Sequence, residues 1–289
     1  MVLALVAVLV VVFDPVAKGG VTPVPDVLTA RIESFTDAMY ATQAYRPPDQ
    51  SEQATAARGF ADVVAHDRPS SADLADLGFT VTDLVDPVTH RPFTLIQNEP
   101  NTARAWGMYL IDRSAPPSLA VEVPHPAFDL HSELFGLDLF RATPGAVLLI
   151  AGAHRRADGS RADVAHDPDS LFQVMATYLA GRGLAQAQMH GFDNDSAPGY
   201  DIVLSTGTTP TSGAAIRAGA GFHAAGLAAC LAWAQPCAGL EGTTNVQGQL
   251  AKTDGTVFLH VEMSRTVRDS QMYRELVGKV LAGADIGAP

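Results

Sequence analysis

Two histidines stand directly after predicted β-strands, where α/β proteins commonly carry their functional sites. His125 follows the apolar run 118–123, and His190 follows the run 184–189 and precedes a glycine. Residues just past the carboxyl ends of parallel strands lie along one edge of a sheet. Neutral imidazole is a common zinc ligand, so we predict that both histidines bind one metal ion.

A carboxylate near His125 is the predicted third ligand. We expect a helix over 128–141 that begins with Asp129 and carries Glu133 one turn later. Side chains four residues apart share a helical face, so Glu133 is expected to point back towards His125. Two histidines and one carboxylate leave a fourth position for water, as in hydrolytic zinc sites. The alternative is that His125 caps the helix and that both acids are solvated charges favoured by its dipole.

A strand late in the chain carries a carboxylate suited to general-base catalysis. In the alternating run 257–263, His260 and Glu262 share one face of a predicted strand. A glutamate on an otherwise apolar strand suggests a base that acts beside a metal-activated water. The competing interpretation is a structural ion pair between Glu262 and Arg265 or Arg268.

A basic turn follows the buried strand predicted over 145–151. The planar guanidinium of Arg155 is suited to holding a substrate carboxylate with two hydrogen bonds, which lysine cannot do in the same way. His154 is a candidate proton donor or additional nitrogen ligand, and Asn245 and Arg265 are further candidates for substrate binding. A solvated basic turn is the alternative for this segment.

Several acids and one histidine follow in a polar loop that contains Asp163, His166, Asp167 and Asp169. Such residues can orient ligand histidines from behind the metal. The alternative is an ordinary solvated loop.

Predicted strands alternate with predicted helices through the second half of the chain. This order predicts the α/β class, with a mixed, largely parallel central sheet and helices on both faces. Residues 28–68 are expected to form two helices broken at 46–49. The remaining predicted helices cover 128–141, 169–181, 211–234 and 271–281, and the predicted strands cover 79–82, 93–96, 106–111, 118–123, 145–151, 184–189, 200–204 and 257–263.

The first 25 residues differ from the rest. The apolar run Val2–Phe13 is too short to span a bilayer and suits either the core of an export signal or a buried strand. Residues 18–25 are rich in glycine and proline and are typical of a linker. We therefore expect a leader and linker over 1–25 and one α/β domain with a helical N-terminal part over 26–289.

The two cysteines, Cys230 and Cys237, leave two interpretations open. They could form a disulfide in an exported protein, or they could be two buried cysteines on or near a helix. The compartment, cytoplasmic or exported, stays open with them.

Composition excludes some classes of function. Hydrophobic residues make up 47% of the chain and charged residues 17%, which is enough apolar material for a sizeable core. The formal net charge is −12, and no basic run interrupts it. Nucleic-acid binding needs clustered lysine and arginine, so we expect no nucleic-acid partner, and we expect no stable membrane span.

The order of these features resembles the N-formylglutamate amidohydrolase family and, more distantly, zinc carboxypeptidases and poly-γ-glutamate hydrolases. The resemblance covers roughly residues 118–268. It rests on the following sequence features, in order: His125 at a strand end, Ser132-Glu133, Leu139-Phe140, the run 145–151, Arg155, Asp163, His190 and Glu262.

The resemblance implies a role for each of these polar residues. His125, Glu133 and His190 would bind zinc. Arg155 would hold a substrate carboxylate, and Glu262 would act as the base.

Two departures from these families concern the substrate rather than the fold. Asp163 leads into Val-Ala-His-Asp-Pro-Asp instead of an Asp-Leu-Asn-Arg-like run, and the ligand spacing exceeds the His-x-x-Glu of carboxypeptidases. The fold is therefore expected to carry over better than the identity of the substrate.

The predicted function is a zinc-dependent hydrolase that cuts an amide bond in a small acidic or peptide-like substrate. The alternative is a non-catalytic protein that binds a metal or ligand within the same fold. A serine hydrolase is disfavoured because the sequence has no G-x-S-x-G motif. A Rossmann dinucleotide-binding protein is disfavoured because no G-x-G-x-x-G follows an early strand.

Overall fold

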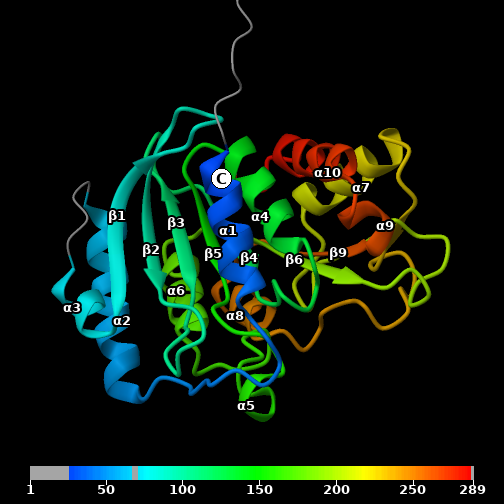
Figure 1. The fold of residues 1–289 in the computed structure, drawn as a ribbon. Coiled ribbons are helices and arrows are strands. Elements are labelled where there is room, and N and C mark those ends of the chain that lie inside the picture. Colours follow the sequence, from blue (N-terminus) through cyan, green and yellow to red (C-terminus); the bar gives the residue numbers. More distant parts are fainter. Residues whose placement is uncertain (1–25, 67–70, 288–289) are drawn as a thin grey trace, which may run out of the picture.

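A nine-stranded mixed sheet organises the protein in the computed structural model, which describes residues 26–66 and 71–287 (Figure 1). The expected leader and linker over 1–25 lie outside the described residues. Among the helices described, none is long and apolar enough to cross a membrane. In spatial order the strands are β1 (Phe79–Val85), β2 (Pro92–Asn98), β3 (Met108–Asp112), β5 (Ala146–Ile150), β4 (Leu119–Val123), β6 (Ala185–Phe192), β9 (Phe258–Ser264), β7 (Ile202–Ser205) and β8 (Ala229–Leu231).

The centre of this sheet is parallel and its flanks are mixed. Parallel pairing joins β5 to β4, β4 to β6 and β6 to β9. Antiparallel pairing joins β1 to β2, β2 to β3 and β3 to β5. On the far side, β7 pairs antiparallel with β9 and parallel with β8. The predicted fold class, α/β with a mixed and largely parallel central sheet, is confirmed.

Helices cover both faces of the sheet, as predicted (Figure 1). Successive residues of a strand point to opposite faces, and Val121 and Ala120 accordingly join different apolar clusters. One face is covered by α1 (Val27–Asp37), α4 (Ser132–Ala142), α7 (Gly213–Ala224) and α10 (Gln271–Gly283). The other is covered by α2 (Gln50–Ala65), α3 (Ala72–Asp76), α6 (Leu171–Ala180) and α8 (Val246–Asp254), and two short helices are α5 (Ala157–Ser160) and α9 (Arg265–Arg268).

The predicted break between the first two helices has a clear local cause. The Asp49 side chain accepts a hydrogen bond from the Glu52 amide, and the Glu52 side chain accepts one from the Asp49 amide. This reciprocal capping box satisfies two backbone donors that the first turn of α2 leaves free. The Glu52 carboxylate also pairs with Arg46, which fixes the chain just before the helix.

The helix predicted over 128–141 was placed too early. Helix α4 begins at Ser132, because His131 has a left-handed backbone with φ of 70° that interrupts any regular helix before it. The preceding residues form tight turns in which the amides of Phe128 and Asp129 both donate to the His125 carbonyl. Asp129 therefore lies in a turn and Glu133 in a helix, so their side chains do not share one helical face.

The long helix predicted over 211–234 was wrong. Helix α7 ends at Ala224, and Gly226 then takes a left-handed φ of 78° that turns the chain into strand β8. Cys230 lies in this strand and forms a disulfide with Cys237, with an S–S distance of 2.05 Å. The disulfide alternative is therefore confirmed, and helix α8 is an element that the sequence pattern did not predict.

Close packing of α4 on the sheet fixes the strand end that carries His125. A Cβ atom at Gly136 would lie 2.6 Å from Val123 Cγ2 and 2.9 Å from Leu148 Cδ1. Val123 is the last residue of β4, and valine is stiff about its first side-chain torsion. Helix α4 can therefore pack this closely against β4 only because Gly136 has no side chain.

We expect the substitution Gly136→Ala to destabilise the protein. Alanine gains about 1 kcal/mol of helix propensity over glycine. Overpacking a well-filled core costs about 1–3 kcal/mol, and here the neighbouring valine cannot rotate away. Thermal melting should therefore show a lower Tm for Gly136→Ala. The matched control is Gly283→Ala at the exposed end of α10, where a Cβ atom meets nothing within 4 Å and Tm should hold or rise. An equal or higher Tm for Gly136→Ala would contradict this account of the packing.

Candidate metal centre

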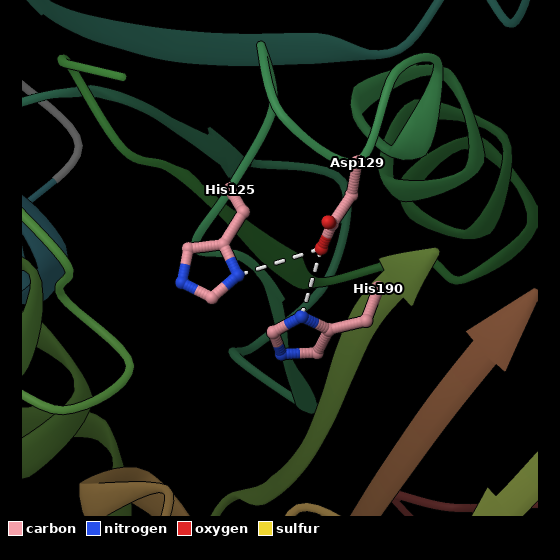
Figure 2. A group of neighbouring side chains, drawn as sticks. All are labelled: His125, Asp129 and His190. Atoms are coloured by element: carbon pink, nitrogen blue, oxygen red, sulfur yellow. Dashed lines mark hydrogen bonds and ion pairs between the residues drawn. The ribbon is translucent and has the colours of Figure 1, made fainter. Parts of the chain in front are cut away.

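Three buried side chains converge at the carboxyl ends of β4 and β6. Strand β6 runs past the predicted end at 189, so His190 lies within the strand rather than after it. The Asp129 Oδ2 atom lies 2.9 Å from His190 Nδ1 and 3.4 Å from His125 Nδ1 (Figure 2). One possible ligand atom from each residue lies within 4.8 Å of the other two. All three residues are at most 4% exposed. The two histidine rings thus contact one buried carboxylate oxygen.

The neighbours of His125 determine which of its nitrogens carries the hydrogen. The Arg155 Nη1 group lies 3.3 Å from His125 Nδ1, and a guanidinium can only donate, so this nitrogen presents a lone pair. On the other side, His125 Nε2 lies 2.7 Å from Asp163 Oδ1. A neutral His125 that accepts from Arg155 donates from Nε2 to Asp163. Burial opposes the charge on His125, but the contacts with Asp129 and Asp163 outweigh it and raise the pKa of this histidine, which favours the charged ring.

The neighbours of His190 likewise favour a hydrogen on Nε2 in the neutral ring. The His190 Nε2 atom lies 3.0 Å from Gln188 Oε1, an amide oxygen that accepts. His190 Nδ1 lies 2.9 Å from Asp129 Oδ2, at hydrogen-bonding distance. A neutral His190 that donates from Nε2 would leave its Nδ1 lone pair for a metal ion. Burial and the nearby charges of His125 and Arg155 lower the pKa of His190, and the hydrogen bond to Asp129 opposes this shift.

Two imidazole nitrogens, His125 Nδ1 and His190 Nδ1, therefore converge on Asp129 Oδ2. Burial favours the neutral carboxyl, but hydrogen bonds from the two histidines and their positive forms hold the pKa of Asp129 below its usual range. A metal ion bound here would take the place of the histidine hydrogens that face this carboxylate. Two imidazole nitrogens and one carboxylate oxygen form a donor set that zinc accepts readily.

A second buried group adjoins this one on β9. His190, His260 and Glu262 also bring possible ligand atoms within 4.8 Å of one another. The His260 and His190 rings lie 4.6 Å apart between centroids, and Glu262 is the direct register partner of His190. Burial, together with the negative charge of Asp129, raises the pKa of Glu262 well above its ordinary value. A cation beside Asp129 would oppose that shift and favour the charged base.

The predicted alternative was an ion pair between Glu262 and Arg265 or Arg268, but both arginines contact other groups. The Arg268 side chain donates to the backbone carbonyls of Met263, Phe192 and Leu130. Arg265 pairs with Asp269 at 2.8 Å. Within the described residues, Glu262 Oε2 has no hydrogen-bond partner, which leaves this atom available to a ligand.

A cavity of about 300 Å³ opens onto both groups. Its walls come from strand ends on one side and from the segment before α8 on the other. Asn245 belongs to this wall, and its side chain donates to Gln188 Oε1. The lining residues are His125, Arg155, His166, His190, His260 and Glu262 together with Gly239, Leu240, Gly242, Thr243, Thr244 and Asn245.

Arg155 is the strongest positive charge in this cavity. Its Nη2 group donates to Asp163, and its Nη1 group faces His125. His154 lies outside the lining and packs edge-on against Phe128, with ring centroids 5.8 Å apart. Burial and the charges of Arg156 and Arg155 lower the pKa of His154. His154 therefore sits at the rim as a neutral ring.

The structure separates the predicted site residues into two sets. It brings His125, His190, Arg155, Glu262 and Asn245 around one cavity. It places Arg265 on α9, outside that lining and paired with Asp269.

Glu133 lies on the opposite face of the sheet from the cavity. Its carboxylate is buried near Glu33 and Asp37 of α1 and Arg274 of α10, and Glu133 belongs to neither group of possible ligands. The carboxylate beside the histidines is instead Asp129, which the sequence shows only as an acid four residues after His125.

Comparison with known proteins gives partial structural likeness. No protein-family model matches the sequence, and no curated protein matches it. The chain is similar to a metallo-carboxypeptidase from Burkholderia cenocepacia, with TM-score 0.39, 12% identity, and coverage of 83% of this chain and 69% of that one. It is also similar to an aspartoacylase family protein from Mesorhizobium loti, with TM-score 0.40, 14% identity, and coverage of 73% and 68%. A third is the LapA aminopeptidase of Legionella pneumophila, with TM-score 0.36, 9% identity, and coverage of 95% and 78%. Because the sequence identities and TM-scores are low, only the side chains of the site carry information about its chemistry.

Glu133 supplies a pH-dependent test of its placement. Burial, with the negative charges of Asp37 and Glu33, raises its pKa from 4.5 to about 7. A carboxyl with a raised folded pKa stabilises the fold below its unfolded pKa, and this contribution is lost as pH rises through the folded pKa. The full loss is about 3 kcal/mol, at 1.36 kcal/mol per pKa unit.

We therefore expect Glu133→Gln to raise Tm at pH 8 by a few degrees and to change it little near pH 4.5. Melting curves of both proteins across this pH range would measure the difference. The exposed Glu99→Gln serves as the control and should follow the wild-type curve. An equal pH dependence of Tm in Glu133→Gln and wild type would show that burial does not raise the pKa of this carboxyl.

Proposed function

We propose that this protein is a zinc-dependent hydrolase that cuts an amide bond in a small substrate bearing a carboxylate. The zinc ligands are His125 Nδ1, Asp129 Oδ2 and His190 Nδ1, with Asp129 in the place first predicted for Glu133. The observation that carries the proposal is the convergence of two buried imidazole nitrogens and one buried carboxylate oxygen. Three protein ligands leave an open position, which catalytic zinc sites need and structural sites lack.

Zinc in such a site lowers the pKa of a coordinated water and polarises a substrate carbonyl. Glu262 is the side chain placed to act as the base. It accepts a proton from the attacking water as the new carbon–oxygen bond forms. It then delivers that proton to the amide nitrogen, which leaves as an amine when the carbon–nitrogen bond breaks. Register pairing with His190 keeps the Glu262 carboxylate beside the metal ligands during both transfers.

The cavity favours a small acidic substrate. Its volume of about 300 Å³ lies at the lower end for small-molecule pockets. The Arg155 guanidinium lines the cavity, and its Nη2 group is held by Asp163 while its Nη1 group lies 3.3 Å from His125 Nδ1. Arg155 is therefore positioned to bind a substrate carboxylate, and Asn245 lies in the facing wall.

If Asp129 rather than Glu133 binds zinc, substitutions of these two acids should have opposite effects on zinc content. Asp129→Asn removes the shared anionic ligand, and His190→Ala removes an imidazole, so either variant should lose zinc on gel filtration. Glu133→Gln should keep one zinc per chain. Elemental analysis of the purified proteins would report the stoichiometry. Zinc retention in Asp129→Asn with loss in Glu133→Gln would restore Glu133 as the ligand.

The base assignment predicts a loss of turnover without a loss of metal. Glu262→Gln keeps the shape of the side chain and removes its basicity. Positioned acid–base groups contribute about 100- to 10,000-fold in rate, so kcat should fall by that factor. Zinc content and Tm should remain at wild-type levels in the same preparation. Unchanged kcat would place the base elsewhere, and His154 at the cavity rim would then be tested.

The substrate assignment predicts a change in KM at Arg155. Arg155→Lys keeps a positive charge but cannot make the fork-shaped contact with a carboxylate. Losing a hydrogen bond to a charged group costs about 1.5–3 kcal/mol, or roughly 10- to 100-fold in affinity. Matched N-acyl amino acids with a free or an amidated carboxyl would measure the effect. The variant should lose discrimination between the two, and undiminished discrimination would exclude Arg155 as the carboxylate site.

A further inference from the structure

We propose that two buried glutamines, Gln188 and Gln247, select the nitrogen through which His190 binds the metal. This inference rests on the metal centre proposed above. We call the chain of hydrogen bonds from the Val164 carbonyl through Gln247 and Gln188 to His190 the amide relay. Both glutamines are fully buried, and neither is a ligand or a predicted substrate contact.

The relay starts from a group whose role cannot change. The Val164 carbonyl is a backbone oxygen and can only accept a hydrogen bond. The Gln247 Nε2 group lies 2.9 Å from this oxygen and 2.9 Å from Gln173 Oε1. These two acceptors use both hydrogens of the Gln247 amide. The Gln247 Oε1 atom must therefore point the other way, towards Gln188.

The orientation of the Gln188 amide follows from that of Gln247. The Gln188 Nε2 group lies 3.0 Å from Gln247 Oε1 and 3.0 Å from Glu122 Oε2. Burial raises the pKa of Glu122 to about 8, so this carboxyl can be neutral, but Gln247 Oε1 is an amide oxygen and can only accept. Both hydrogens of the Gln188 amide are used, so Gln188 Oε1 faces His190. The Asn245 side chain donates to the same oxygen and reinforces this orientation.

The last step determines the histidine tautomer. Because Gln188 Oε1 accepts, it favours a hydrogen on His190 Nε2, 3.0 Å away, while the Asn245 amide lies farther from the same nitrogen, at 3.4 Å, and donates to Gln188. The His190 Nδ1 atom then presents a lone pair towards Asp129. A reversed Gln188 amide would present N–H to Nε2 and place the ring hydrogen on Nδ1, where the metal would bind. The direction of two amides therefore decides whether His190 is a ligand or a blocked site.

The same strand provides a contrast to the relay. Gln186 lies two residues before Gln188, points to the same sheet face and is also fully buried. Within the described chain, neither amide atom of Gln186 has a hydrogen-bond partner. Gln186 therefore has the chemistry and burial of a relay residue without its connections, and this makes it a matched control.

The test compares Gln188→Leu, Gln247→Leu and Gln186→Leu. Zinc affinity would be measured by competition with a chromophoric chelator, and ligand geometry by the visible spectrum of the cobalt-substituted proteins. Loss of an outer partner of a ligand histidine typically costs 10- to 100-fold in metal affinity. We expect about that loss in Gln188→Leu, a smaller loss in Gln247→Leu, altered cobalt spectra in both, and neither change in Gln186→Leu. Melting of each metal-free protein separates a relay effect from a general loss of stability.

Each outcome bears on one of the two proposals. Wild-type affinity and cobalt spectra in both relay variants would overturn the relay and leave the metal centre standing. An equal loss in Gln186→Leu would also overturn it, because a general core defect would then explain the result. A wild-type protein that binds no zinc would overturn the metal centre, and the relay with it.

If Gln188→Leu does not fold, Gln247→Leu decides the question, because it leaves the Gln188 contacts with Glu122 and Asn245 in place. Nitrogen-15 histidine spectra of zinc-loaded wild type give an independent measurement. We expect the His190 ring hydrogen on Nε2, and a hydrogen on Nδ1 would contradict the relay.

Discussion

The proposed site depends on one electrostatic constraint: the buried, ionised Asp129 carboxylate lies against two histidine nitrogens and needs a positive charge beside it. The Asp129 Oδ2 atom lies 2.9 Å from His190 Nδ1 and 3.4 Å from His125 Nδ1, so a protonated ring or a metal ion can supply that charge. The far nitrogens of both rings have acceptors of their own, because His125 Nε2 faces Asp163 and His190 Nε2 faces Gln188. In the proposed holoprotein these acceptors hold the ring hydrogens away from the metal.

The parallel centre of the sheet makes this arrangement possible. Strands β4, β6 and β9 lie side by side and end at the same edge, so residues far apart in sequence meet there (Figure 1). On the face towards α6 and α8, Gln188 of β6 donates to Glu122 of β4 and to Gln247 of α8. The opposite face is packed with apolar residues against α4 and α10. The polar contacts behind the site therefore lie on one face of the central strands, away from the apolar cluster under α4 and α10.

Sequence patterns predicted the strand-end residues well and the turns poorly. His125, His190, Arg155 and Glu262 follow or end apolar runs, and a run of that kind locates the edge of a sheet. Asp129 rather than Glu133 lies beside the histidines, because helix α4 starts later than its periodicity suggests, after a left-handed His131. Gln188 gave no signal, since a glutamine within a strand is ordinary until its partners from α8 are known. Long-range contacts, rather than local pattern, decide such roles.

Zinc K-edge X-ray absorption of protein loaded with one equivalent of zinc tests the metal centre most directly. The account predicts a first shell of nitrogen and oxygen at about 2.0–2.2 Å, with the outer-shell scattering of two imidazole rings. Substituting Asp129→Asn should abolish that spectrum. A first shell of oxygen alone, or scattering from fewer than two imidazoles, would contradict the convergence of His125 and His190 on one metal.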